Sequence, residues 1–180
     1  MTTKDAYLRS IPELRQYLEG ADVNDTKTIE ADLTLREFLA GAFSYMPRWL
    51  VGLVWIRGLV AKVLRLSHDG SLAIPQMRPE DVPMTPGESA YIFTTHTAKE
   101  DLYWVAHESD SHLDFSLIIA REPLENTSRF YVSTLVFYNK RVGRFYFALI
   151  APFHHFIVRQ MMKSAVKKGL ARKAQSPNEG

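Results

Sequence analysis

The feature that most constrains the fold of this chain is a change of hydrophobic period near residue 139. Before it, residues 90–138 have the alternating apolar and polar pattern of β-strands, and their last run, residues 129–138, is rich in Val, Phe, Tyr and Thr. After it, residues 143–171 follow a helical period. The sequence therefore predicts an α+β fold, in which an antiparallel sheet has one face covered by a long C-terminal helix.

Two short polar segments divide this strand region. Residues 98–101 predict a turn between strands at 91–97 and 102–107. Residues 108–111 predict the next turn, before a strand at 112–120. Because side chains alternate along a strand, an apolar face, expected to point inward, carries Tyr91, Phe93, Thr95, Leu102, Trp104, Ala106, Leu113, Phe115, Leu117 and Ile119. The mixed face, expected to meet solvent, carries Ile92, Thr94, His96, Tyr103, Val105, His107, His112, Asp114, Ser116 and Ile118.

A first strand and two helices are predicted before this sheet region. Residues 28–33 have the character of a strand, and Asp32 or Thr34 is placed to cap a helix that runs through Phe43. A second helix is predicted over Trp49–Leu66. In the otherwise polar N-terminal segment, a short helical pattern is formed by Leu8, Ile11, Leu14 and Leu18.

The Trp49–Leu64 segment is nearly all apolar, but its 16 residues include Arg57 and Lys62. A membrane-spanning helix needs about 20 apolar residues. We therefore interpret this segment as a helix that is buried on most of its circumference, with a helix lying on a membrane surface as the alternative. Residues 67–89 follow with four prolines and predict an unusually long loop, which is a candidate lid or partner surface.

One ordinary domain accounts for a chain of 180 residues. We place it at residues 28–173, after a polar extension with a short helix at 1–27 and before a disordered tail at 174–180. The chain contains no cysteine, which excludes disulfides and a zinc site built from thiolates. Its N-terminus lacks the basic-then-apolar order of a signal peptide, so a cytoplasmic location is expected.

Charge is unevenly distributed, although the net charge is only +2. Between Arg159 and Lys173 there are six cations and no acid, which suits an acidic partner or an anionic membrane surface, or simply a solvated helix face. Aromatic and basic residues do not interleave as in nucleic-acid-binding proteins, so no nucleic-acid partner is predicted. Residues 49–59 carry more large apolar side chains than one contact face of a helix can bury. A homodimer could bury the remainder without lipid and is therefore favoured over membrane recruitment.

Several motifs resemble the domain-of-unknown-function 2867 family, within the START and birch-pollen-allergen-like helix-grip (SRPBCC) superfamily. They are Met46-Pro47-Arg48-Trp49, His112-Leu113-Asp114-Phe115, and Asn139 with Gly143-Arg144-x-Tyr146 and Pro152-Phe153-His154. The similarity spans roughly residues 28–170. The family has no assigned reaction. What the superfamily resemblance implies is a long helix that grips a curved sheet over an apolar pocket, which commonly holds lipids, sterols or polyketides.

The resemblance and the apolar face together indicate a candidate ligand site between the sheet and the last helix. Phe153, Ile157, Met161 and Ala165 recur at i, i+4 spacing on that helix. The candidate ligand-binding residues are Phe93, Trp104, Phe115, Leu117, Tyr146, Phe153, His154, Ile157 and Met161. The leading hypothesis is non-catalytic binding of a small hydrophobic, lipid-like or polyketide-like molecule, with no cofactor. The same residues would also suit a filled core without a cavity.

The histidines are the candidates for chemistry. His107 and His112 are predicted to face each other across a turn, near Asp114, as a divalent-metal or general-base group or as an exposed polar pair. No metal site is predicted from them. An enzyme of the cyclase or hydratase kind would instead need a titratable group in the pocket, with candidates His154, Tyr146 and Tyr91. Pro152 predicts a kink or break in the last helix.

Overall fold

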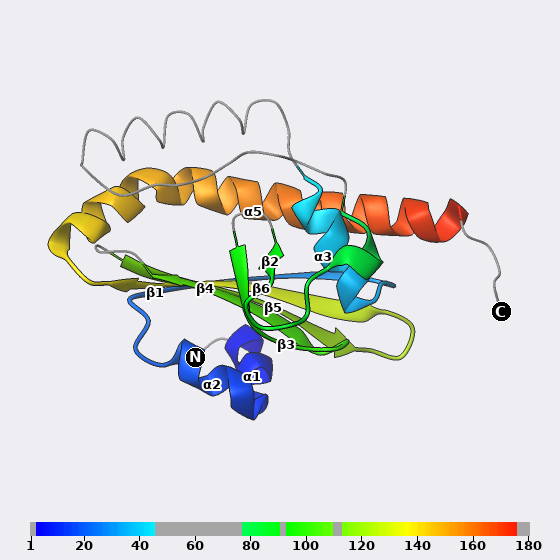
Figure 1. The fold of residues 1–180 in the computed structure, drawn as a ribbon, viewed down its shortest axis with the longest axis horizontal. Coiled ribbons are helices and arrows are strands. Elements are labelled where there is room, and N and C mark those ends of the chain that lie inside the picture. The colour runs from blue at the N-terminus through cyan, green and yellow to red at the C-terminus, as the bar shows by residue number, and fades with distance from the viewer. Residues whose placement is uncertain (1–2, 46–76, 91–92, 110–112, 176–180) are drawn as a thin grey trace.

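A computed structural model describes residues 3–45, 77–90, 93–109 and 113–175 of the chain. Its sheet has six antiparallel strands in the order β1-β6-β5-β4-β3-β2 (Figure 1). The strands are β1 (Val23–Ala31), β2 (Ser89–Ala90), β3 (Phe93–Lys99), β4 (Tyr103–Ser109), β5 (Leu113–Pro123) and β6 (Ser128–Tyr138). The helices are α1 (Thr3–Ser10), α2 (Pro12–Leu18), α3 (Leu35–Phe43), the short 3-10 helix η1 (Pro79–Asp81) and α5 (Arg141–Gln175). The predicted α+β fold with a long C-terminal helix is confirmed.

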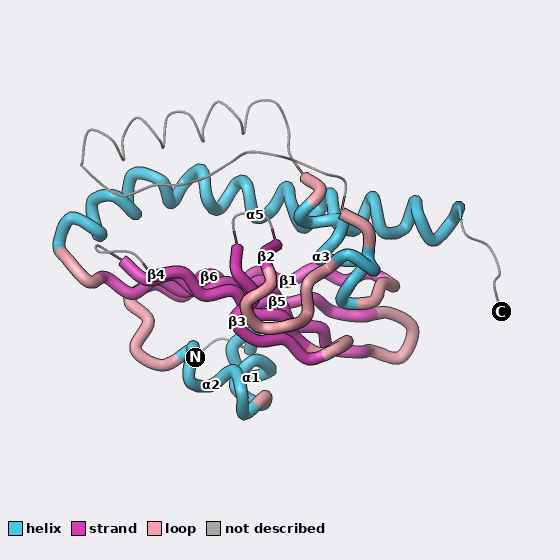
Figure 2. The backbone as a smooth tube through the Cα atoms, viewed as in Figure 1, coloured by secondary structure: helices cyan, strands magenta, loops and turns pink. Residues whose placement is uncertain are grey.

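Helices cover both faces of the sheet. Figures 1 and 2 show α5 and α3 along one face, and α1 and α2 against the other. The first, which we call the inner face, carries the predicted apolar side chains such as Trp104 and Leu117. The expectation that the opposite, outer face meets solvent is wrong for Tyr103, Val105 and Ile118, which are buried. They pack against the apolar side chains of α1 and α2, namely Leu8, Ile11, Leu14 and Leu18.

The predicted register of the first hairpin is also wrong. β3 continues to Lys99 and β4 begins at Tyr103, so the turn lies about two residues later than expected. Asp101 in this turn has a φ of 56°, a left-handed conformation that aspartate tolerates better than most residues. β1 likewise begins at Val23, five residues before the predicted start at residue 28.

Thr34, one of the two predicted caps, is the N-cap of α3. Its side chain accepts a hydrogen bond from the backbone N–H of Glu37, and Glu37 accepts one from the backbone N–H of Thr34. This capping box satisfies two backbone donors that the first turn of a helix leaves without partners. The predicted second helix at residues 49–66 lies outside the described residues.

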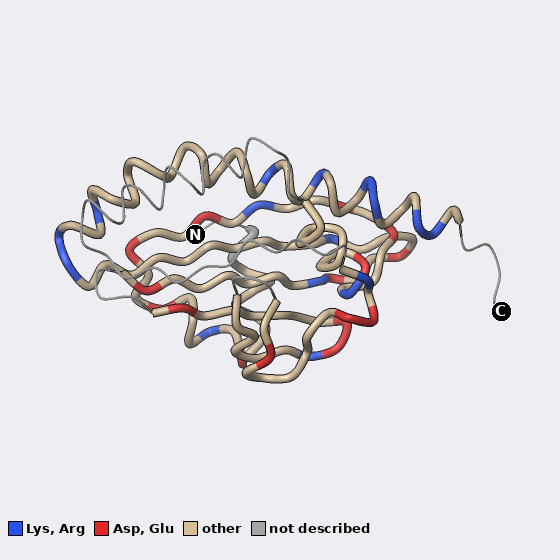
Figure 3. Tube along the Cα trace, turned by 45° about the horizontal axis from the view of Figure 1, so that its top comes forward, with Lys and Arg blue, Asp and Glu red and all other residues tan. Residues whose placement is uncertain are grey.

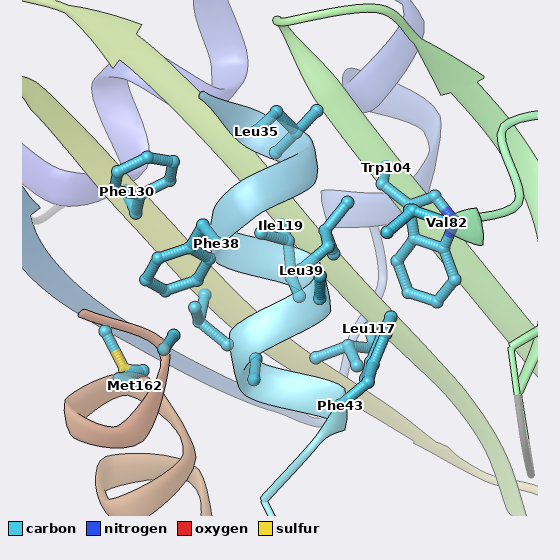
Figure 4. Packing of buried hydrophobic residues seen from close by; sticks show 14 of the residues in the cluster. Leu35, Phe38, Leu39, Phe43, Val82, Trp104, Leu117, Ile119, Phe130 and Met162 are labelled. Carbon is cyan, nitrogen blue, oxygen red and sulfur yellow. The ribbon is translucent and has the colours of Figure 1, made fainter. Parts of the chain in front are cut away.

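α3 lies between the sheet and the C-terminal half of α5 (Figure 4). On the sheet side, the ring of Phe38 stacks on that of Phe130 with 4.2 Å between centroids. On the other side, Gly41 approaches α5 so closely that a Cβ atom there would lie 2.7 Å from the Cα of Ala165. Lys168 of α5 also donates a hydrogen bond of 2.6 Å to the carbonyl of Ser44, which follows α3.

α5 runs without a break through Pro152, so of the predicted kink or break the break is absent. Proline removes the hydrogen bond to the carbonyl four residues earlier, here that of Ala148. Both Pro152 and Ala148 are exposed, so the carbonyl left without a helical partner is not forced into the apolar core. In the described part of the chain, no helix is long and apolar enough to cross a membrane.

Candidate functional site

The two halves of α5 meet different surfaces. The C-terminal half packs on α3, whereas the N-terminal half lies directly over the inner face at β6 and β1. His154 reaches the sheet through Thr134, with 3.0 Å between His154 Nε2 and Thr134 Oγ1. The ring of Phe147 lies 6.2 Å from that of Tyr138 at the end of β6. The N-terminal half of α5 and the inner face therefore form the two sides of the candidate site.

The sheet side of this site is an aromatic wall. Phe93 lies 5.9 Å from Phe115, centroid to centroid, and both side chains are only partly buried. Leu117 is next to Phe115 on the same face of β5 and is buried. Trp104 is fully buried, and its Nε1 donates to the carbonyl of Pro83 at 3.0 Å and to Thr95 Oγ1 at 3.1 Å. Trp104 therefore supports the wall from within the core, whereas Phe93 and Phe115 present its surface.

The helix side contains only part of the predicted set. Tyr146 is buried, Ile157 is half-buried and Met161 packs against the core. Phe153 is not with them, since 51% of its surface is exposed. Successive positions at i, i+4 spacing turn by about 40° around a helix with 3.6 residues per turn. The predicted stripe consequently begins outside at Phe153 and ends inside at Ala165, which is fully buried.

His154 is the polar group that faces the sheet. Burial is the main cause that lowers its pKa, and the nearby charge of Lys27 adds to this, so the pKa falls to about 4. Its imidazole is therefore neutral at pH 7. Thr134 is itself buried, with 1% of its surface exposed, so the hydrogen bond between them is shielded from solvent.

Next to His154 is a group of polar side chains that was not predicted from the sequence, which we call the ionic cluster: Asp25, Lys27 and His155. His155 Nδ1 lies 2.7 Å from Asp25 Oδ2, and Lys27 forms an ion pair with the same carboxylate. Burial alone raises the pKa of Asp25, but hydrogen bonds from Lys27 and His155 outweigh it and hold the pKa below its ordinary value. The cluster links the edge strand β1 to α5.

The predicted grouping of His107 with His112 and Asp114 does not hold for the residues described. His107 pairs with Ser116 across β4 and β5, and its Nδ1 lies 2.9 Å from Ser116 Oγ. Asp114 pairs with Ser109 instead and accepts a hydrogen bond from Asn139. His112 and Tyr91 lie outside the described residues. Among residues that the structure describes, no group of three or more His, Cys, Asp or Glu side chains is arranged to hold a metal ion.

The lowered pKa of His154 predicts a loss of stability in mild acid. An unfolded chain binds a proton at this histidine below its ordinary pKa of 6.5, whereas the folded protein does so only near 4. Stability from the neutral ring is full above pH 6.5 and falls as the pH drops toward 4, by about 2–3 kcal/mol. Urea denaturation across this range measures the loss.

His154→Gln is expected to flatten that pH dependence, whereas His96→Gln, at an exposed histidine of β3, leaves it in place. Asp25 contributes in a separate window. Because its folded pKa lies below the ordinary 3.8, its stabilisation is lost only at lower pH. An unchanged slope between pH 6.5 and 4 in His154→Gln would contradict the assignment.

Comparisons with known proteins identify the family. A family profile described as Protein of unknown function (DUF2867) matches residues 17–161. Comparisons with curated proteins and with solved structures gave no match. The matched region covers more than half of the chain and includes the aromatic wall, His154 and the ionic cluster. The chain therefore belongs to the DUF2867 family.

Proposed function

We propose that this protein binds a small, mostly apolar molecule between the inner face of the sheet and the N-terminal half of α5, without transforming it. The observation that carries the proposal is a neutral, largely buried His154 that contacts Thr134, the cross-strand partner of Leu117, on the face of the sheet that carries the partly exposed aromatic wall. An apolar surface with one or two fixed polar groups is the usual character of a small-molecule site. Phe93, Phe115 and Leu117 supply that surface.

The polar group of the ligand follows from the state of His154. Its Nε2 is engaged by Thr134, which leaves Nδ1 as the ring nitrogen for a ligand. A neutral imidazole donates or accepts one hydrogen bond there and brings no charge. Lys27, the nearest cation, is already paired with Asp25. We therefore expect a hydroxyl or carbonyl group on the ligand rather than a carboxylate.

An enzyme that acts on such a ligand is the second candidate. The His155–Asp25 contact favours it, since a carboxylate that orients an imidazole is a common arrangement for general-base catalysis. His155, however, contacts an Asp25 carboxylate that Lys27 also engages, and this contact links β1 to α5. His154, which does face the site, has a pKa of about 4 and is a weak base at pH 7. The residues thus favour binding over catalysis.

Native mass spectrometry of the purified full chain tests the binding proposal. We expect one bound small molecule per chain, which organic solvent extracts. In His154→Phe, which keeps an aromatic ring but removes its hydrogen bond, the affinity for added 1-decanol is expected to fall about tenfold, the equivalent of one hydrogen bond. His96→Phe is the matched control on the outer face. Equal occupancy in both variants, or a folded protein that binds neither a cellular molecule nor decanol, would contradict the proposal.

A further inference from the structure

Large apolar side chains form a row on the outward side of α5, away from the sheet. Phe145 is 80% exposed, Leu149 59% and Phe153 51%, and Val142 precedes them at 37%. Their spacing of three or four residues places them on one side of the helix, and we call them the apolar ridge. Single exposed apolar residues are common on protein surfaces, but a continuous row of them marks a contact surface.

The charge of α5 is entirely positive. Its 35 residues include no Asp and no Glu, and Figure 3 shows only Lys and Arg among the charged residues along it. Lys168 and Lys173 contact Ser44 and Asp32, which lie on either side of α3, and Arg172 donates to the carbonyl of Met77. Arg144 lies near Asp22. The remaining cations are exposed on or beside the outward side: Arg141, Arg159, Lys163 and Lys167. Cations thus stand at both ends of the apolar ridge.

We propose that the apolar ridge docks this protein on the surface of an anionic phospholipid bilayer. Phe and Leu side chains enter the boundary between headgroups and acyl chains, while flanking Lys and Arg attract anionic headgroups. α5 then lies in the plane of the surface, and His154 faces away from the lipid toward the sheet. The proposal is independent of the ligand site, because the two use opposite sides of the helix.

Charge favours an anionic bilayer over a second copy of the chain, or another segment of the same chain, as the partner of the apolar ridge. A two-fold dimer would place the same acid-free helix of a second copy against α5, so that cations would meet cations. Residues 46–67 of the chain itself carry four cations and no acid, so their charge offers no complement either. An anionic bilayer complements both features, because its acyl chains receive the apolar ridge and its negative headgroups attract the flanking cations.

Flotation of the full chain with vesicles tests the docking. We expect binding to vesicles of phosphatidylcholine with 30 mol% phosphatidylserine, at least tenfold weaker binding to phosphatidylcholine alone, and a decline as salt rises. Phe145→Ser with Leu149→Ser should reduce binding at least tenfold, because both side chains are exposed and their loss leaves the fold intact. Lys163→Gln with Lys167→Gln should reduce it about tenfold and weaken the salt dependence.

Arg15→Gln with Arg78→Gln is the charge-matched control, since both residues are exposed cations outside α5. Equal losses in this control and in the Lys163 and Lys167 variant would overturn the proposal. So would equal binding to both kinds of vesicle, or none to either. A concentration-dependent dimer that Phe145→Ser abolishes would assign the ridge to a second copy. Hydrogen-exchange protection of the ridge in the free monomer, lost on deletion of residues 46–67, would assign it to that segment.

Discussion

Replacement of Trp104 by alanine is expected to lower the free energy of unfolding by about 3–5 kcal/mol, the largest effect of any single change that we predict. The indole is fully buried against Phe43 and Phe93, at centroid distances of 5.2 and 6.5 Å. Its removal leaves a large cavity and takes a donor from Thr95, a buried residue. Chemical denaturation, followed by circular dichroism, measures the loss.

Phe115→Ala is the comparison for Trp104→Ala. Phe115 is only partly buried, so its truncation should cost less than half as much while it still removes part of the aromatic wall. Phe115→Ala should therefore weaken decanol binding while it lowers the free energy of unfolding only modestly. Trp104→Ala should mainly lower the free energy of unfolding. Equal loss of stability in the two variants would mean that Trp104 does not support the wall from the core.

The second large effect is expected at Gly41, where valine should destabilise the protein by about 3 kcal/mol. A Cβ at this position lies 2.7 Å from the Cα and 2.8 Å from the carbonyl oxygen of Ala165. Both are backbone atoms, so α5 itself has to move away from α3. In a helix without this contact, a side chain in place of glycine would stabilise, so the sign of the change tests the close packing of α3 on α5.

Gly169→Ala is the matched control for Gly41→Val. Its added Cβ would meet the side chain of Leu33 at 2.6 Å, which has more freedom to adjust than a backbone. A smaller loss is therefore expected, again from chemical denaturation. If Gly41→Val proves as stable as the unsubstituted protein, α3 and α5 do not approach as closely as described.

Local signals predicted much of the fold. Alternation identified the inner face of β4 and β5, and Thr34 was one of two predicted caps for α3. The packing of α1 and α2 on the outer face was not predicted. A short pattern such as Leu8, Ile11 and Leu14 indicates an amphipathic helix, but it does not indicate which surface the helix packs against. Tyr7 illustrates this, since its ring stacks on that of Tyr131, far along the chain, at 4.8 Å.

The candidate site was predictable only in part, for the same reason. Phe93, Phe115 and Leu117 share a face through strand alternation alone, and the structure places them together. Thr134 was missed because its partner His154 lies 20 residues away on another element. The ionic cluster depends on β1, which was predicted to begin after Asp25 and Lys27. The spacing of those two residues, which puts opposite charges on one face of a strand, was the available signal.

The central claim is that a ligand binds on the sheet side of α5, and chemical-shift mapping with 1-decanol tests it most directly. Added to the isotope-labelled full chain, decanol should shift the resonances of Leu117, Thr134 and His154 at a ratio of one molecule per chain. Phe145 and Leu149, on the outward side of the same helix, should remain unshifted. Shifts confined to Phe145 and Leu149, or saturable shifts nowhere in the protein, would contradict a site between the sheet and α5.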